Sequence, residues 1–121
     1  MTCPSAARTL LALLALLCLT ACRSPYVETT IENTGAAPLR LIEVDYPSAS
    51  FGLQSLDPHG AYHYHFKIQG TGPVTITFTD AAGKSHTVAG PILREGQQGT
   101  LHITIDPSNG VSWGLHLTGA K

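Results

Sequence analysis

The feature that most constrains this chain is a hydrophobic pattern with a period of two that begins at Tyr26 and continues to Leu117. Successive side chains of a β-strand point to opposite faces, so this period predicts half-buried strands. No segment after residue 25 shows the helical period of 3.6 residues. The expected inward positions are Val27, Thr29, Ile31, Tyr62, Tyr64, Phe66, Ile68, Val74, Ile76, Phe78, Leu101, Ile103, Ile105, Val111, Trp113, Leu115 and Leu117. The chain is therefore expected to be all-β.

Turn sequences separate these runs at intervals of about 8 to 12 residues, as in an antiparallel sandwich or barrel. The clearest of them are Asn33-Thr34-Gly35, Asp57-Pro58-His59-Gly60, Asp80-Ala81-Ala82-Gly83 and Asp106-Pro107-Ser108-Asn109-Gly110. We expect seven or eight strands. Of the two architectures we favour the sandwich, in which a few large side chains, such as Phe66 and Trp113, bridge two sheets about 10 Å apart. Both residues are expected to be buried.

Two segments fit the alternation less well. Leu39 and Leu41 have one parity, whereas Ile42 and Val44 have the other, and a β-bulge near Leu41 would reconcile them. The segment with His86, Val88 and Ile92 is a weaker inward row. Arg94 to Gly99 is polar and rich in glycine, which indicates a flexible loop that could serve as a contact site.

The first 21 residues have a different character. Arg8 precedes an apolar run at residues 10–19, and Thr20 and Ala21 follow it. A positive start, a short apolar run and a small-residue exit are typical of an export signal peptide. The run is too short to span a bilayer, which takes roughly 20 apolar residues.

Leu19-Thr20-Ala21-Cys22 resembles the lipobox of bacterial lipoproteins. The resemblance implies that the Cys22 thiol receives a diacylglyceryl group, that cleavage occurs before Cys22, and that a fatty acid such as palmitate acylates the new amine. It divides the chain into a signal peptide (1–21), a lipid attachment and short linker (22–25), and a β-sandwich domain (26–121). Cleavage removes the other two cysteines, Cys3 and Cys18, so the domain has no disulfide. By resemblance to the enterobacterial sorting rule, Arg23 and Ser24 imply the periplasmic face of the outer membrane in a host with two membranes.

A second resemblance covers about a third of the chain. Ile31 to Gly35, Leu39 to Val44 and Leu56 to Gly60 are similar to the turn and strand patterns of immunoglobulin-like modules in bacterial envelope proteins. The resemblance implies an immunoglobulin-like sandwich and a non-catalytic role. It carries no functional residue to this sequence.

Charge and motifs narrow the function. Without Arg8 the mature part has six basic and eight acidic side chains, which argues against a nucleic-acid partner. No Gly-x-Ser-x-Gly motif is present, and no spacing of Ser, His and Asp indicates an enzyme. We expect a lipid-anchored, non-catalytic domain without a cofactor, which binds or scaffolds an envelope protein or glycan.

The histidines suggest an alternative, a periplasmic metal-binding domain. His63 and His65 leave the same face of one expected strand, and His102 and His116 have the same outward parity in theirs. Three imidazoles could hold zinc or copper if these strands were neighbours. However, we expect two sheets to divide the strands between them, and the cation Lys67 follows on the same face. We therefore expect no high-affinity metal site.

Overall fold

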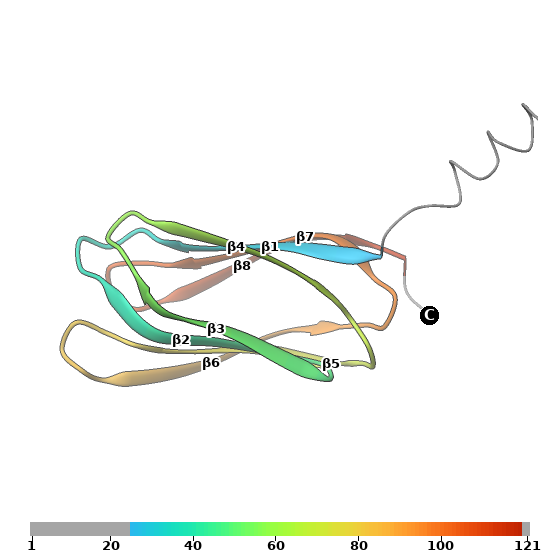
Figure 1. The fold of residues 1–121 in the computed structure, drawn as a ribbon, viewed down its shortest axis with the longest axis horizontal. Coiled ribbons are helices and arrows are strands. Elements are labelled where there is room, and N and C mark those ends of the chain that lie inside the picture. The colour runs from blue at the N-terminus through green and yellow to red at the C-terminus, as the bar shows by residue number, and fades with distance from the viewer. Residues whose placement is uncertain (1–24, 120–121) are drawn as a thin grey trace, which may run out of the picture.

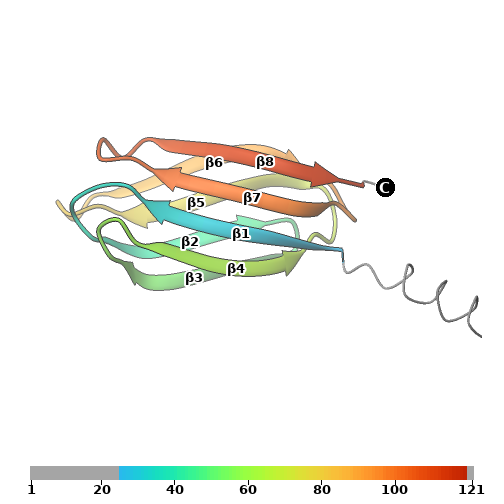
Figure 2. The same cartoon turned by 90° about the horizontal axis from the view of Figure 1, so that it is seen from above.

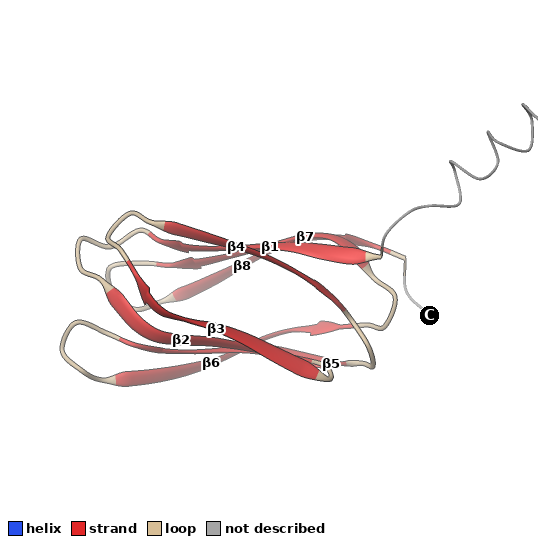
Figure 3. Ribbon diagram, in the orientation of Figure 1, coloured by secondary structure: helices blue, strands red, loops and turns tan. Residues whose placement is uncertain are grey.

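A computed structural model describes residues 25–119 and shows eight strands and no helix in this range (Figures 1 and 3). The strands are β1 (Tyr26–Asn33), β2 (Leu39–Tyr46), β3 (Ala49–Leu56), β4 (Ala61–Lys67), β5 (Gly72–Thr79), β6 (Ser85–Leu93), β7 (Gln98–Ile105) and β8 (Val111–Thr118). The all-β prediction with seven or eight strands is confirmed. Within the described range, no helix is long and apolar enough to cross a membrane.

The strands form two four-stranded sheets that lie face to face as a sandwich (Figures 1 and 2). Sheet A has the order β4-β1-β7-β8, and sheet B has the order β3-β2-β5-β6. The edge strands β4 and β8 of sheet A lie over the edge strands β3 and β6 of sheet B (Figure 2). The predicted sandwich is therefore confirmed over the predicted alternative, a barrel.

One strand pair departs from the antiparallel expectation. β1 and β7 are parallel, with Val27 opposite Gly99 and Asn33 opposite Ile105. Each strand runs from one end of the sandwich to the other, so successive strands alternate in direction. The first and the seventh strand therefore run in the same direction. Nothing in the alternation of either strand specifies its neighbours, because alternation encodes only which face is buried.

The alternating strand directions give the sandwich two distinct ends. We call the end at which β1 begins the proximal end. β8 finishes there, and the turns at residues 47–48, 68–71 and 94–97 lie at this end. The loops at residues 34–38, 57–60, 80–84 and 106–110 lie at the opposite, distal end (Figure 2).

The core consists of the inward rows of both sheets. Its buried members are Val27, Ile31, Leu39, Ile42, Val44, Phe51, Leu56, Phe66, Ile68, Val74, Ile76, Phe78, Leu93, Leu101, Ile103 and Ile105. Stacked rings close the side between β3 and β4, with centroids 4.0 Å apart for Tyr46 and Phe66 and 4.2 Å apart for Phe51 and Tyr64. The predicted burial of Phe66 is confirmed.

The other side of the sandwich is closed by Trp113, which is only partly buried, contrary to our expectation. Its ring packs on Gly90 of β6, where an added Cβ would lie 2.7 Å from the indole. Trp113 is inward in parity, but β8 is an edge strand, so part of the ring faces solvent. The alternation gives the inward direction of a side chain but not its distance from the sheet edge.

Two register shifts change which residues of β2 and β6 face the core. The predicted bulge near Leu41 is confirmed by a register shift between Arg40 and Glu43 and by a φ of 49° at Leu41. A second shift, between Pro73 and Thr75 in the pairing of β5 with β6, turns Ile92 outward and Leu93 inward. The inward assignment of Ile92 was therefore wrong. The sequence did not indicate this second shift, because Ile92 and Leu93 are both apolar and either residue could occupy the inward position.

Asn33 links the ends of three segments at the distal end. It is buried, and its amide nitrogen lies 2.9 Å from the carbonyl oxygen of Ala37 and 3.1 Å from that of Asp57. Its side-chain oxygen accepts a hydrogen bond from the Gly35 amide at 3.0 Å. The asparagine of the first predicted turn therefore ties backbone groups of the loops at residues 34–38 and 57–60 to the end of β1.

The burial of Phe66 leads to a stability prediction. Phe66→Ala should lower the free energy of unfolding by about 3–5 kcal/mol, because it removes a ring that stacks on Tyr46 and leaves a cavity between the sheets. Denaturant unfolding of the full chain in detergent measures the change. The matched control is Leu41→Asn at an exposed position with positive φ, which asparagine tolerates, and it should change stability by about 0.5 kcal/mol or less. A loss below about 1 kcal/mol for Phe66→Ala would contradict the prediction.

Candidate functional site

Cys22, the predicted lipid attachment site, lies outside the described residues 25–119. The same holds for the predicted signal peptide. Both remain predictions. The described residues show the surfaces of the domain that such an anchor would hold at a membrane.

Four histidines share the outer face of sheet A. His63 and His65 stand on β4, His102 on β7 and His116 on β8. Our expectation that two sheets would divide these strands was wrong, because β4, β7 and β8 all belong to sheet A. Alternation supplied the outward direction of each side chain, but the strand order brings the four together.

The strand register arranges this face in rows across the sheet. One row runs from His63 through Thr30 to His102, and the next toward the proximal end runs from His65 through Glu28 and Thr100 to His116. Because these two rows combine imidazole and hydroxyl groups with the Glu28 carboxylate, the face presents hydrogen-bond donors and acceptors close together.

The distal half of this face is internally paired. His63 Nδ1 lies 3.0 Å from Thr30 Oγ1, and His102 Nε2 lies 3.0 Å from Glu32 Oε2. The His102–Glu32 pair is well exposed, so it contributes little to stability. These contacts occupy part of the binding capacity of the side chains that make them.

The proximal half of the face contains a shallow groove of about 520 Å³, which we call the proximal groove. Its lining comes from all four strands of sheet A: Tyr26 and Glu28 from β1, His65 from β4, Gln98, Gly99 and Thr100 from β7, and His116 and Thr118 from β8. Tyr26 packs edge-on against His65, with ring centroids 5.1 Å apart and an interplanar angle of 85°. Gly99 has a φ of 136°, and an added Cβ would lie 2.0 Å from the carbonyl oxygen of His116. A side chain there would force β7 and β8 apart.

The same face was the candidate metal site. In the part of the chain that the structure describes, no group of three or more His, Cys, Asp or Glu residues is placed to hold a metal ion. His63 and His65 supply two imidazoles on one strand face, fewer than the three protein ligands of a catalytic zinc site or the four of a structural one.

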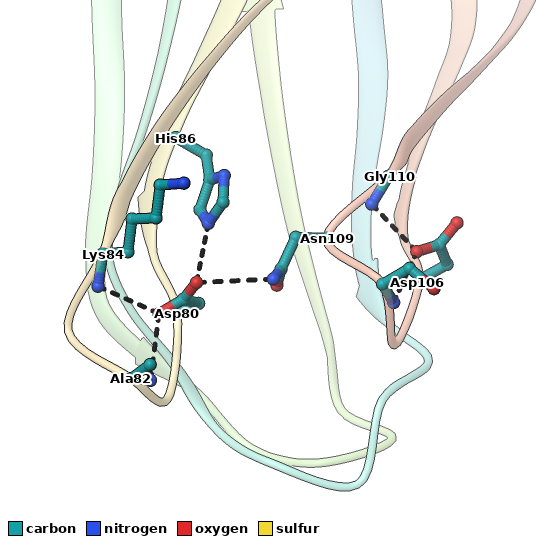
Figure 4. Close-up of polar contacts among 8 residues, drawn as sticks. Asp80, Ala82, Lys84, His86, Asp106, Asn109 and Gly110 are labelled. Carbon is teal, nitrogen blue, oxygen red and sulfur yellow. Dashed lines mark hydrogen bonds and ion pairs between the residues drawn. The ribbon is translucent and has the colours of Figure 1, made fainter.

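A second polar cluster, which sequence reasoning did not identify, lies among the distal loops (Figure 4). Asp80 Oδ2 lies 2.7 Å from His86 Nε2 and accepts a hydrogen bond from the side-chain Nδ2 of Asn109 at 3.3 Å. Asp80 Oδ1 accepts hydrogen bonds from the backbone N–H groups of Ala82 and Lys84, both at 2.9 Å. The hydrogen bond from His86 is the main cause of a lowered pKa for the Asp80 carboxyl, followed by the backbone bond from Lys84.

The position of His86 gives this cluster a structural role. The ring stacks on Phe78 with centroids 5.0 Å apart, so one of its faces covers the core. Asp106 forms a comparable turn, in which its Oδ1 accepts hydrogen bonds from the amides of Ser108 and Gly110 at 2.8 Å. The Asp-x-x-Gly pattern of residues 80–83 indicated the hairpin, but the pairing with His86 depends on the fold of β6.

The segment from Arg94 to Gly99 differs from the flexible loop that we expected. The Arg94 amide donates a hydrogen bond to Gln97 Oε1 at 2.8 Å, and the Gln97 amide donates one to the Arg94 carbonyl at 3.2 Å. Gln98 and Gly99 already belong to β7. The segment is thus a short hydrogen-bonded turn at the proximal end.

Comparisons with known proteins identify the fold only. No protein-family model matches the chain, and no curated protein sequence matches it. Among solved structures, the chain is similar to an NMR structure of a protein from Eubacterium rectale, with 14% sequence identity and a TM-score of 0.55. The match covers 76% of this chain and 89% of the other. The similarity supports the β-sandwich and says nothing about the chemistry of either face.

The placement of His63 and His65 leads to a binding prediction. Zinc or copper(II) titrated into the full chain should bind only weakly, because two neighbouring imidazoles leave the ion short of protein ligands. The double variant His63→Ala/His65→Ala should keep the thermal midpoint of the parent, measured by circular dichroism. A stoichiometric site tighter than about micromolar that disappears in this variant would favour the metal-binding alternative.

The Asp80 cluster leads to a prediction about pH. An aspartate whose pKa is lowered by folding stabilises the protein above its unfolded pKa of about 3.9, and this contribution disappears as the pH falls through the folded pKa. Asp80→Asn should therefore be less stable than the parent near neutral pH, and the difference should shrink in stronger acid. Denaturant unfolding at several pH values measures it, and a difference that is independent of pH would contradict the assignment.

Proposed function

We propose that this chain is a lipid-anchored, non-catalytic domain of a bacterial envelope that binds or scaffolds another envelope component. The observation that carries the binding role is the outer face of sheet A, where side chains from four strands form an open polar surface with a shallow groove. An open face suits an extended partner, whereas chemistry on a small molecule favours a deep pocket with converging polar groups.

The anchor part of the proposal is supported by the lipobox and by the start of the domain. Cys22 is separated from β1 only by Arg23, Ser24 and Pro25, and β1 begins at the proximal end of the sandwich. A lipid on Cys22 would hold the proximal end toward a bilayer and direct the distal loops away from it. In a host with two membranes, we propose the periplasmic face of the outer membrane.

An immunoglobulin-like type of sandwich is part of the same proposal. In immunoglobulin domains, the second strand lies beside the fifth in one sheet, and the third lies beside the sixth in the other. Here β1 lies beside β4 and β2 lies beside β5, so the same three-strand offset occurs in both sheets. The position of the first immunoglobulin strand is taken by β7, which pairs with β1 in parallel.

A metal-binding function is the second candidate. The shared face of His63, His65, His102 and His116 favours it, because sheet A brings these histidines together from three strands. The scaffold proposal is preferred because, among the described residues, no three metal-ligating side chains on this face are placed to hold one ion, and a zinc site needs at least three.

The anchor is tested by replacing its acceptor. Cys22→Ala should abolish incorporation of a fatty-acid analogue and leave the precursor uncleaved or released, because Cys22 is the only cysteine that follows the signal sequence. Metabolic labelling followed by electrophoresis measures incorporation.

The sequence itself provides matched controls. Cys3→Ala and Cys18→Ala change cysteines within the proposed signal peptide and should keep the label. Equal labelling of the parent and Cys22→Ala would refute the anchor. Fractionation of a two-membrane host tests the location, and recovery solely with inner-membrane markers would contradict the proposed sorting.

A further inference from the structure

We infer that the proximal groove is a binding site for an uncharged glycan. This inference rests on the proposed envelope function and assigns its binding role to one place and one class of ligand. The groove suits such a ligand in three respects: its hydrogen-bonding state, its charge and its aromatic surface.

The groove differs from the rest of its face in hydrogen bonding. Among residues 25–119, no side-chain hydrogen bond joins Glu28, His65 or His116 to another described residue, whereas His63 and His102 in the distal half are paired with Thr30 and Glu32. Gln98 and Thr100 in the groove are likewise without a side-chain partner in this range. The groove therefore offers both donors and acceptors to a ligand.

The charge of the groove favours an uncharged ligand. Glu28 is the only carboxylate among the described residues that line it, and Lys67, opposite Tyr26 in the register of β1 and β4, supplies one positive charge beside the groove. A site for a polyanion would need an excess of basic side chains, as phosphate-binding surfaces have. Hydroxyl groups suit the side chains that are present, because each hydroxyl can both donate and accept a hydrogen bond.

The aromatic surface supplies the apolar part of such a site. Tyr26 is 42% exposed, which is high for a large apolar side chain, and its edge contact with His65 limits the orientations of the ring. A sugar ring has an apolar C–H face that can cover a tyrosine ring while its hydroxyls reach polar neighbours such as Glu28 and Gln98.

The size and openness of the groove suit a segment of a polymer. Its volume of about 520 Å³ falls within the range of small-ligand sites, and its lining crosses all four strands of sheet A. Because the strands lie about 4.8 Å apart, a lining that crosses four of them can accept a chain of several sugar rings.

The inference is tested by adding two uncharged probes, a tetramer of N-acetylglucosamine and a tetramer of glucose, to the isotope-labelled full chain in detergent micelles. At least one probe should shift the backbone amide signals of β1, β7 and β8 at the groove in a saturable manner. Tyr26→Ala and Glu28→Gln should each weaken binding about tenfold, which corresponds to about 1.4 kcal/mol.

Glu32→Gln is the matched control, because it makes the same change on the same strand outside the groove. It should leave the affinity within about twofold of the parent. The inference is overturned if neither tetramer gives a saturable shift at about 10 mM, or if Glu32→Gln weakens binding as much as Glu28→Gln. It is also overturned if zinc alone or a polyanion saturates the same signals while both sugars fail.

These outcomes are distinct from those that test the anchor. A chain that is labelled at Cys22 but binds neither sugar would overturn only the glycan site. A chain that binds sugar but takes no label would remove the anchor and keep the groove.

Discussion

The structure depends on the burial of one apolar face of each sheet against the other sheet. Because no cysteine follows Cys22 in the sequence, no disulfide within the domain adds to the stability of this core. This burial requires closure at the two open sides of the sandwich as well as filling between the sheets. Stacked rings from β2, β3 and β4 close one side, and the indole of Trp113 against Gly90 closes the other. The outward-facing side chains of both sheets lie outside this core.

The sequence predicts the parts of this arrangement that local chemistry specifies. The alternation located the inward rows, and the parity change at Leu41 located a bulge. It did not predict which strands become neighbours, so the parallel β1–β7 pair and the shared face of the four histidines emerged only in the structure. Ile92 was assigned inward because it shares the parity of His86 and Val88. The register shift reverses this parity, and the adjacent apolar residue Leu93 is buried instead.

The same limit applies to the candidate site. His65 and His116 were identified as outward residues, but their common groove requires β4, β1, β7 and β8 in that order. Gly99 carries no side-chain chemistry, and its importance lies in allowing the carbonyl of His116 to approach β7 closely. The Asp80–His86 pair likewise depends on the path of β6 after its hairpin. In each case the residue type was visible, and its partner was determined by the tertiary fold.

The parallel pairing of β1 with β7 has a consequence for how the protein is made. β1 is a central strand whose second neighbour is almost the last segment to be synthesised, so the pair closes a loop of nearly the whole domain. Contacts this distant in sequence slow folding, and until β7 arrives one edge of β1 has unpaired backbone groups. A chain that emerges from a ribosome or a translocation pore, N-terminus first, therefore cannot complete sheet A part by part. Sheet A remains incomplete until nearly all of the chain has emerged, and until then the unpaired edge of β1 is accessible to chaperones, proteases and other strands.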